Sequence, residues 1–539
     1  MDHPPHDPTT SPTPPTDPHS APHPAPSSPA RSPDPGSGAS RLLAVLCAIV
    51  FASLAILWQN LPPETQYDLL RIAPPEAPED APAISSVSQV NLLGRVYIRM
   101  DKLTERMSAG APSGPTADLG ATSMEFIDQS VFTPAEAVAA AVAAAELLDD
   151  PQEALDRLAG VRGEQEERLE EARGRLAAQP SDGPDRESLE QSIAHHEKIL
   201  LDVETLTAIY QGEGDRLTPE QRERLVTRYD YFGKLANTYA LDDTDPARAP
   251  LLSGGGAIIG LLLLIGLLIL VVFITGLVLL LLGVIKLSGG RMAMRFEPPA
   301  PGGSLFLEVY ALFVAGFLVM TVGATALSSK NEALASLLAL VVQWSLLLVP
   351  FWPLLRGMKG KAFRHAIGLH RGRGVLREIG AGITAYIASV PVFFFGVLLT
   401  VVIMFIAESI RVASGRDPGP VPENPVIDIV SQADPIVLVL IFLLATIWAP
   451  LTEELVFRGA LYRWFRGRLV WPLSAFLVGL LFAFMHSYGP LMVSPLVALG
   501  FMFSFMREWR GSIIACITAH FVHNFSVFAI AGSIIYLLA

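Results

Sequence analysis

The sequence predicts an all-α fold: a polytopic transmembrane helical bundle of about nine spans, with an inserted soluble helical domain and a disordered N-terminal tail. Of the 539 residues, 51% are hydrophobic, and the mean hydropathy is +0.42. Uncharged apolar runs recur at lengths near the ~20 residues that a helix needs to cross a bilayer. Residues 61–249 hold 18 Lys and Arg against 36 Asp and Glu, whereas residues 250–539 hold 19 against 12. An acidic soluble part is therefore joined to a basic membrane part.

The first 60 residues divide into a tail and an anchor. Residues 1–40 contain 13 prolines among mostly small and polar residues, a composition that cannot bury a core, so we predict a disordered tail. The run from Leu42 to Trp58 has 17 uncharged residues and is just long enough to span a bilayer. It begins too late for an ordinary cleaved signal peptide and lacks a small-residue cleavage motif. We therefore predict a transmembrane anchor over residues 41–59.

Residues 60–250 are predicted to form a soluble, mostly helical, extracytoplasmic domain. The segments Thr133–Glu136 and Thr218–Gln221 both fit a capping box with proline in the first turn of a helix. A heptad-like stripe predicts a helical hairpin or short coiled coil. This domain contains no catalytic constellation, which leaves sensing, substrate recruitment or binding of a partner open as its role. The residues of the stripe are Leu189, Ile193, His196, Leu200, Val203 and Tyr210.

Residues 251–539 are predicted to form a polytopic membrane domain, in which basic and non-basic loops alternate. The loop 356–377 contains seven Lys and Arg, and the acidic loop 407–434 contains two. The positive-inside rule then places the N-terminal tail in the cytoplasm and the acidic domain and the C-terminus on the opposite side. We expect an integral, multi-pass protein of a bacterial cytoplasmic membrane. The spans expected in this domain are 257–284, 304–327, 333–355, 379–406, 435–456, 470–489, 491–506 and 512–538.

Several classes of protein are excluded by what the sequence lacks. The two cysteines, Cys47 and Cys516, lie in separate apolar runs, so neither a disulfide framework nor a cysteine zinc site is available. No nucleic-acid-binding motif or phosphate loop is present, and we expect no nucleic-acid partner. The lipid bilayer is the one partner that composition alone implies.

A small group of polar residues in the last spans can perform acid–base or ligand chemistry. Charged side chains at membrane depth are costly, so they are rare and usually face a protein interior or a wet cavity. At 1.5 Å per residue, Glu453 and His486 both lie roughly 22–27 Å from the turn near Arg468, so antiparallel helices bring them to one height. The same reasoning, applied from the turn near Gly511, predicts a shared hydrated pocket. Its candidate members are Glu453, Glu454, Arg458, His486, His520, His523 and Asn524.

Local spacing assigns different roles to the two adjacent glutamates. Glu454 and Arg458 are i,i+4 neighbours, so an ion pair can neutralise one carboxylate and leave Glu453 free. This pair could instead be only a structural bridge, and Glu453 only an interfacial residue. Pro450 leaves the Thr446 carbonyl without its helical donor and permits a kink, which is tolerated where the backbone lines a cavity.

The histidines also fall at helical spacing. Phe482 and His486 share a helix face at i,i+4, as do His520 and Asn524. Taken singly, His486 could be an interfacial residue, and His520 with Asn524 a hydrogen-bonding pair between helices. Spacing does not choose between His523 and Asn524. Together, the coincidence of these residues at a common depth favours a functional site.

Three motifs made by these residues resemble those of the CPBP family, the CAAX-protease and bacteriocin-processing intramembrane proteases related to type II CAAX prenyl endopeptidases. That family carries E-E-x-x-x-R, F-x-x-x-H and H-x-x-x-N on successive membrane helices. The resemblance covers roughly residues 360–535, and most specifically 450–525. In this chain the motifs are Glu453-Glu454-Leu455-Val456-Phe457-Arg458, Phe482-Ala483-Phe484-Met485-His486 and His520-Phe521-Val522-His523-Asn524.

The resemblance implies an intramembrane endopeptidase that hydrolyses a peptide bond of a membrane-associated protein or peptide. Glu453 and His486 would activate a water, and His520 and Asn524 would stabilise the oxyanion. A carboxylate in a low-dielectric pocket suits a general base, and hydrogen-bond donors aimed at a developing oxyanion supply a large electrostatic term. We expect the catalytic layer to be approached from the cytoplasmic side. The implied catalytic set is Glu453, Glu454, His486, His520 and Asn524, supported by Arg458 and Phe482.

The family is often described as one of metalloproteases, so Zn²⁺ stays a candidate cofactor. Glu453, His486 and His520 could supply three ligands and leave the fourth position to a water. No H-E-x-x-H motif is present, and the ligands would come from three helices, which favours a glutamate-activated water. Two other functions stay open: a non-catalytic membrane binding or immunity protein that retains the fold, and a transporter with a proton relay. A transporter would be expected to show an inverted repeat, and none is evident.

Overall fold

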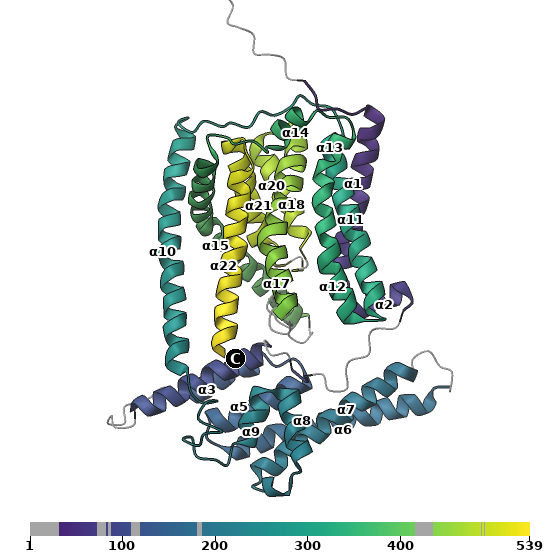
Figure 1. The fold of residues 1–539 in the computed structure, drawn as a ribbon. Coiled ribbons are helices and arrows are strands. Elements are labelled where there is room, and N and C mark those ends of the chain that lie inside the picture. The colour runs from purple at the N-terminus through teal and green to yellow at the C-terminus, as the bar shows by residue number, and fades with distance from the viewer. Residues whose placement is uncertain are drawn as a thin grey trace, which may run out of the picture.

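Helices make up all the regular secondary structure in the part of the chain that the computed structural model describes. That part comprises residues 32–72, 82–84, 88–108, 119–180, 186–414, 435–486, 488–489 and 491–538. The predicted tail up to residue 31 and the acidic loop from residue 415 to residue 434 lie outside it. The helices form a tall bundle and a smaller domain at one end of that bundle (Figure 1). The all-α prediction is confirmed.

Seven segments of the described chain are long and apolar enough to cross a membrane. Their composition and length, together with the packing of the bundle, make this an integral membrane protein. The seven are α1 (Gly38–Gln59), α10 (Gly255–Ser288), α11 (Leu305–Ser328), the segment Leu334–Leu355, α15 (Val375–Ala413), the segment Ile436–Arg466, and α22 (Ile514–Leu538). The segment Leu334–Leu355 comprises most of α12 (Glu332–Val342), a 3₁₀ helix (Gln343–Phe351) and α13 (Trp352–Leu355).

Two of the expected spans are shorter than the others. They are α20 (Trp471–Phe484), with 14 residues, and α21 (Ser494–Arg510), with 17. These two helices pack tightly as a hairpin because glycines meet at their crossing, where a Cβ on Gly500 would lie 2.6 Å from the Gly479 Cα. The hairpin therefore reaches only part of the way into the bundle from the end where Trp471 and Arg510 lie, and this determines where the cavity lies.

The segment Ile436–Arg466 changes its helical register twice. It begins as α17 (Pro435–Leu443) and passes through a π-helical turn (Leu444–Trp448) into α18 (Ala449–Glu453). A second π-helical stretch (Glu454–Leu461) leads into α19 (Tyr462–Arg466). Such π-helical insertions are frequent at functional sites.

The smaller domain has its own hydrophobic core. The predicted hairpin is present as α6 and α7, which pack side by side and extend away from the bundle axis (Figure 1). The predicted capping boxes at Thr133 and Thr218 both form. The domain's helices are α3 (Gln89–Ser108), α4 (Leu119–Asp128), α5 (Pro134–Leu147), α6 (Pro151–Ala178), α7 (Arg186–Tyr210), α8 (Pro219–Tyr229) and α9 (Tyr231–Asn237).

Helix α3 joins this domain to the bundle. It lies across the lower end of the bundle, close to the C-terminus (Figure 1). The Arg99 guanidinium donates to the carbonyl of Leu537 at 3.2 Å and to that of Leu251 at 3.2 Å. At the start of α10, a Cβ on Gly255 would lie 2.2 Å from the Arg99 carbonyl oxygen, so only glycine allows this approach.

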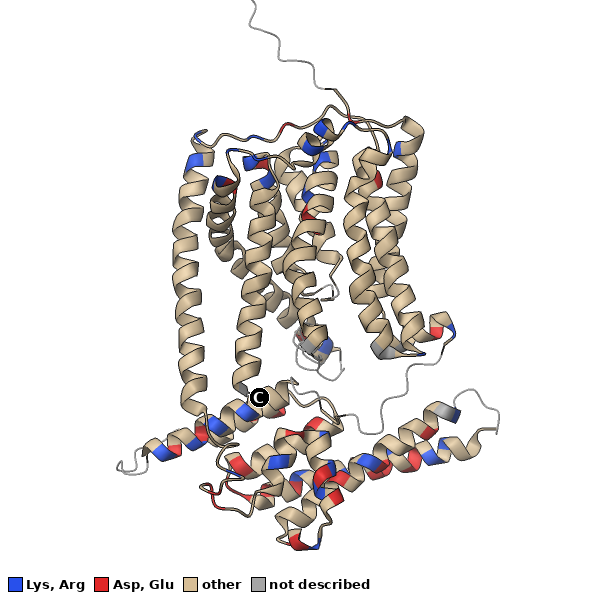
Figure 2. Cartoon of the chain, viewed as in Figure 1, with Lys and Arg blue, Asp and Glu red and all other residues tan. Residues whose placement is uncertain are grey.

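Most of the Lys and Arg residues of the bundle gather at its opposite end, which we call the basic end (Figure 2). The start of α1 and the short helix α14 (Gly360–Ile367) lie there, whereas α2 (Pro63–Leu70) follows the other end of α1 (Figure 1). Residues 32–37, at the end of the predicted tail, lie against the segment before α11. There Asp34 accepts two hydrogen bonds from Arg463, at 2.8 and 3.0 Å.

Candidate active site

The register change in the Ile436–Arg466 segment creates an acceptor for a side chain of the last span. In the first π-helical turn the Ala449 N–H donates to the Leu444 carbonyl, an i→i+5 pattern. The next donor in that pattern would be Pro450, which has no N–H. The Ala445 carbonyl instead accepts from the Asn524 side-chain amide at 2.7 Å. The sequence predicted that Pro450 removes the α-helical donor of the Thr446 carbonyl; in the π-helical register, the Ala445 carbonyl also loses its donor to Pro450.

Glu454 lies at the centre of a buried ionic cluster. Its Oε1 accepts from Arg458 Nη1 at 2.9 Å and from His520 Nδ1 at 2.9 Å. Arg458 also donates to the Gly500 carbonyl at 3.3 Å, and both members of the ion pair are fully buried. The predicted Glu454–Arg458 ion pair is confirmed. Removing one member of such a pair leaves a buried unpaired charge, which typically costs about 3–5 kcal/mol.

Glu453 points away from that cluster and into a cavity. Its side chain is 14% exposed, and its Oε2 has no hydrogen-bond partner among the described residues. This oxygen lies 3.9 Å from His520 Nε2. Because Glu454 holds the other ring nitrogen, His520 presents Nε2 towards Glu453. A separation of this length between two polar atoms is one that a bridging water can satisfy.

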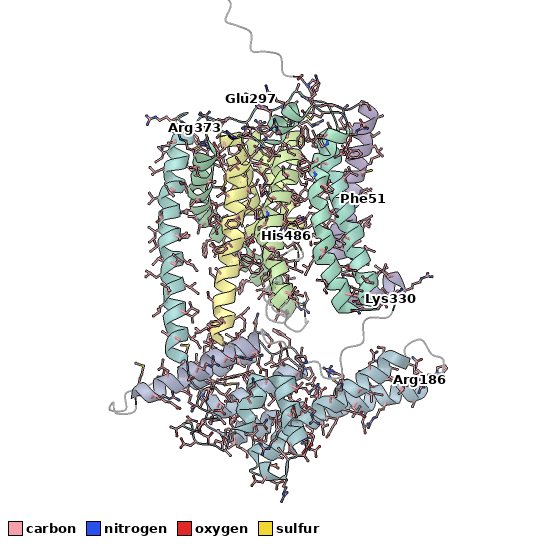
Figure 3. The ribbon with its side chains drawn as sticks, viewed as in Figure 1. Phe51, Arg186, Glu297, Lys330, Arg373 and His486 are labelled. Atoms are coloured by element: carbon pink, nitrogen blue, oxygen red, sulfur yellow. The ribbon has the colours of Figure 1, made fainter. Side chains whose placement is uncertain are left out.

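His486 lies just beyond the end of α20 rather than on its face. The helix ends at Phe484, so the prediction that the second motif lies on one helical face was wrong in this detail. His486 stays over Phe482 nevertheless, because its Nδ1 donates to the Phe482 carbonyl at 2.8 Å and the two rings lie 4.8 Å apart. A carbonyl can only accept, so Nδ1 carries the proton and Nε2 is the free ring nitrogen. Figure 3 shows His486 inside the bundle, between Arg373 at the basic end and Lys330 at the other.

One cavity of about 280 Å³ receives side chains from all three motifs. The structure therefore brings together residues that are up to 71 positions apart in the chain, and it leaves Glu454 and Arg458 behind the cavity wall. Phe482 forms part of that wall and also covers the Arg458 guanidinium at 4.4 Å. The motif residues that line the cavity are Glu453, Phe482, His486, His520, His523 and Asn524.

Other lining residues were missed by the sequence analysis. Gln343, at the end of α12, is one, and its single amide in an otherwise apolar run was a signal that could have found it. Trp448 is another, and its buried indole N–H has no acceptor among the described residues. Tyr488 stacks on His486 with ring centroids 6.3 Å apart. These three residues surround the motif side chains with one amide and two aromatic groups.

The cavity extends from the glutamate layer towards the end of the bundle that carries the soluble domain. Ile441 of α17 and Phe528 of α22 both line it. Helix α17 starts, and α22 ends, near the soluble domain (Figure 1). The tip of the short α20–α21 hairpin closes the cavity on the side of the basic end. The expected approach from the cytoplasmic side corresponds, by the positive-inside rule, to the basic end, whereas Ile441 and Phe528 extend the cavity lining away from that end.

The residues suggested as zinc ligands do not form a ligand set. Among the described residues, no group of three His, Cys, Asp or Glu side chains lies close enough to hold a metal ion. His486 uses Nδ1 for a backbone carbonyl, and His520 uses Nδ1 for Glu454. The chemistry derived below therefore uses only the side chains of this chain.

Comparison with known proteins decides the family of this segment. Residues 435–526 match the family model of the Rce1-like proteins, described as type II CAAX prenyl endopeptidase Rce1-like. This segment belongs to that family. The match to the CAAX endopeptidase model spans about a sixth of the chain and includes all three motifs, and it confirms the resemblance seen in the sequence.

The CAAX endopeptidase segment carries the cavity almost entirely. Of the lining residues, Gln343, Val527 and Phe528 alone lie outside the matched range. The soluble domain also lies outside it. No curated protein and no solved structure matched the chain. Since the family is one of proteases, the chain is assigned to the hydrolases, and its reaction and substrate are taken up below.

Proposed function

We propose that this protein is an intramembrane endopeptidase that hydrolyses a peptide bond of a membrane-associated protein or peptide. One observation carries the proposal: a Glu453 carboxylate oxygen that has no partner among the described residues faces His520 Nε2 at 3.9 Å in a cavity within the bundle. An unsatisfied buried carboxylate is costly to the fold, so it needs an explanation other than stability. A bound water and a substrate carbonyl supply that explanation.

In the proposed reaction Glu453 is the general base. A water held between Glu453 and the free Nε2 of His486 attacks the substrate carbonyl carbon, and its proton passes to Glu453. The tetrahedral intermediate then collapses as the C–N bond breaks. Glu453 returns the proton to the departing amine nitrogen, so the products are a carboxylic acid and an amine.

The oxyanion of the intermediate is stabilised from the other side of the cavity. Asn524 uses one amide N–H for the Ala445 carbonyl, and its second N–H is available for the oxyanion. His520 can donate from Nε2 when both of its ring nitrogens carry protons. The Glu454 and Glu453 carboxylates lie on the two sides of this ring. Glu454, which the family resemblance placed in the catalytic set, is thus a positioning residue and not one of the reacting groups.

The orientation of the cavity bears on how a substrate enters. With the basic end in the cytoplasm, the cavity is reached from the extracytoplasmic half of the bilayer, where the soluble domain lies. Its lining is mainly apolar, which suits an unwound segment of a membrane-spanning substrate. The soluble domain then recruits the substrate or a partner that delivers it.

The test compares membrane peptides from cells that carry wild-type protein, Glu453→Gln or His486→Ala. We expect a defined set of new peptide termini in the wild type and their loss in both variants. Glu308→Gln is the matched control, because it removes the same charge from a span outside the cavity. Undiminished termini in both active-site variants would reject the proposal. If Glu453→Gln also rescued a deletion phenotype fully, while removal of the soluble domain did not, the binding or immunity function would replace it.

A further inference from the structure

Two neighbouring cavities at the basic end share three arginines and lie apart from the candidate active site. The larger has a volume of about 670 Å³, within the range of about 300–1,000 Å³ that is usual for ligand sites. The smaller has a volume of about 190 Å³. Arg295, Arg373 and Arg510 line both. A continuous site thus combines a wide apolar compartment with a narrow basic one.

The smaller cavity has an excess of positive charge. Five arginines line it: Arg295, Arg373, Arg463, Arg507 and Arg510. The carboxylates that face them are Glu297 in the lining, Glu378, which binds Arg510, and Asp34, which binds Arg463. Two positive charges remain without an acidic counterpart, and an anion is the ligand that would balance them.

Arg507 is the clearest sign of an anion site. It is 1% exposed, yet its guanidinium donates only to backbone carbonyls, those of Ala366, Arg458 and Gly511. No carboxylate lies within ion-pair distance of it in the described ranges. Arg295 and Arg373 are exposed and likewise form no ion pair with a described residue. Guanidinium groups in this state are suited to phosphate, which they bind through paired hydrogen bonds.

Apart from Thr384 and five basic residues (Lys286, Arg291, Arg295, Arg373 and Arg510), the residues that line the larger cavity are apolar or glycine. It lies between α10 and the surface formed by α15, α20 and α21, and its walls include Leu282, Ala388, Trp471, Phe501 and Phe505. Gly283 also lines it, and a Cβ built there would meet no atom within 4 Å. The space beside α10 at Gly283 is therefore open and bounded mainly by apolar side chains, as an acyl chain requires.

We propose that these two cavities together bind a phospholipid with an anionic headgroup. Its phosphate lies among Arg295, Arg373 and Arg507, and an acyl chain lies between α10 and α15. Basic pockets between membrane helices on the cytoplasmic side are suited to anionic headgroups. A free phosphate ion would satisfy the arginines but would leave the adjoining apolar cavity without an occupant.

The site is placed where such a lipid would support the fold of the membrane domain. Helix α21 lies between this site and the candidate active site, since Phe501 lines the first and Phe503 the second. Arg507 donates to the Arg458 carbonyl at 3.3 Å, so the arginine cluster and the buried ion pair are directly linked. We therefore expect the bound lipid to raise the thermal stability of the whole bundle.

The experiment uses full-length protein in detergent, stripped of endogenous lipid, and measures both lipid adducts by native mass spectrometry and the thermal midpoint. Phosphatidylglycerol should give a single retained adduct and raise the midpoint by several degrees. Phosphatidylcholine and inorganic phosphate should each give a much smaller effect. Equal effects of phosphatidylcholine, or a full effect of inorganic phosphate alone, would overturn the assignment.

Paired variants separate the headgroup from the acyl chain. Arg295→Ala with Arg373→Ala should weaken phosphatidylglycerol binding by at least about tenfold, whereas Arg377→Ala, an exposed arginine outside both cavities, should not change it. Gly283→Phe should block the acyl compartment, whereas Gly266→Phe on the same helix, also in open space, should not. Unchanged binding in Gly283→Phe, or equal losses in each variant and its control, would contradict the proposal.

Discussion

The buried carboxylates of the smaller domain and those of the candidate active site are satisfied by hydrogen bonds to different degrees. In the domain, both oxygens of Glu146 accept from Arg248, at 3.1 and 2.6 Å. Asp202 is satisfied in the same way by Arg224, Arg228 and Tyr229.

In the candidate active site, by contrast, Glu453 and Glu454 each keep one buried oxygen without a partner among the described residues. Elsewhere in the bundle, both oxygens of Glu378 accept from Arg510, as in the smaller domain. A buried charge whose hydrogen bonds are all made stabilises the fold. A buried charge with an unpaired atom indicates a site where a water or a ligand binds. The histidines differ in the same sense. His196 of α7 has partners for both ring nitrogens, Gln165 and Ser192, whereas His486 keeps Nε2 free.

The largest expected effect is the loss of cleavage in Glu453→Gln. The loss of a general base typically costs about 10²–10⁴ in rate. Because the Glu453 oxygen has no partner to lose, the thermal midpoint should stay near that of the wild type. Glu146→Gln in the domain should give the opposite result, lower stability with cleavage unchanged. A cleavage assay and a melting curve on both variants check this contrast. Equal cleavage and equal thermal midpoints in the two variants would contradict it.

The next effect concerns stability in both regions. Arg458→Met leaves Glu454 buried without its cation, and Arg248→Met does the same to Glu146, so each should lose about 3–5 kcal/mol of unfolding free energy. Only Arg458→Met should also abolish cleavage, because Glu454 orients His520. Adding Glu454→Leu to Arg458→Met should recover stability but not activity. Recovery of cleavage in that double variant would show that the ion pair has no positioning role.

A smaller effect is expected at the register change. Asn524→Leu leaves the Ala445 carbonyl unpaired and should cost about 1–3 kcal/mol of unfolding free energy. Pro450→Ala restores a backbone N–H, so the double variant should be more stable than Asn524→Leu alone. Cleavage should stay low in both, since the amide is lost. Denaturation of Asn524→Leu, Pro450→Ala and the double variant measures these changes in unfolding free energy. If the changes of the two single variants simply added in the double variant, the two substitutions would not act on the same Ala445 carbonyl.

The smallest effect is a pH dependence of the α6–α7 hairpin. Burial, and to a lesser extent the Arg168 charge, lowers the pKa of His196 below its usual 6.5. A lowered folded-state pKa means that its contribution to stability is present above about 6.5 and is lost as the pH falls through the folded value. The hydrogen-exchange protection factors of the hairpin, which correct for the intrinsic pH dependence of exchange, should therefore fall slightly below that pH, and less so in His196→Gln. An identical pH response in the two proteins would show that other groups control it.

Much of the fold was predictable because hydropathy reports directly on membrane burial. The anchor, the long spans and the capping boxes all follow from local composition. The short hairpin did not, because Gly489 and Pro490, the residues that signal a turn, come five and six residues after Phe484, where α20 ends. For the site, spacing brought Glu453, His486, His520 and Asn524 together correctly.

Spacing could not reveal that Glu454 lies behind the cavity wall. It also could not give the i→i+5 register at Pro450, which depends on a hydrogen bond to a helix 79 residues away. The end of the bundle towards which the cavity extends could not be predicted either, because it follows from the short length of the α20–α21 hairpin. Each of these features is set by tertiary contacts, on which a single sequence carries no direct signal.

Hydrolysis in isotopically labelled water tests the role of Glu453 most directly. Membranes that contain the wild-type protein, incubated in H₂¹⁸O, should yield membrane peptides whose new C-terminal carboxylates carry ¹⁸O. Membranes with Glu453→Gln should yield none of these labelled termini. The same labelled termini at the same rate in both preparations would contradict the assignment of Glu453 as the residue that activates water.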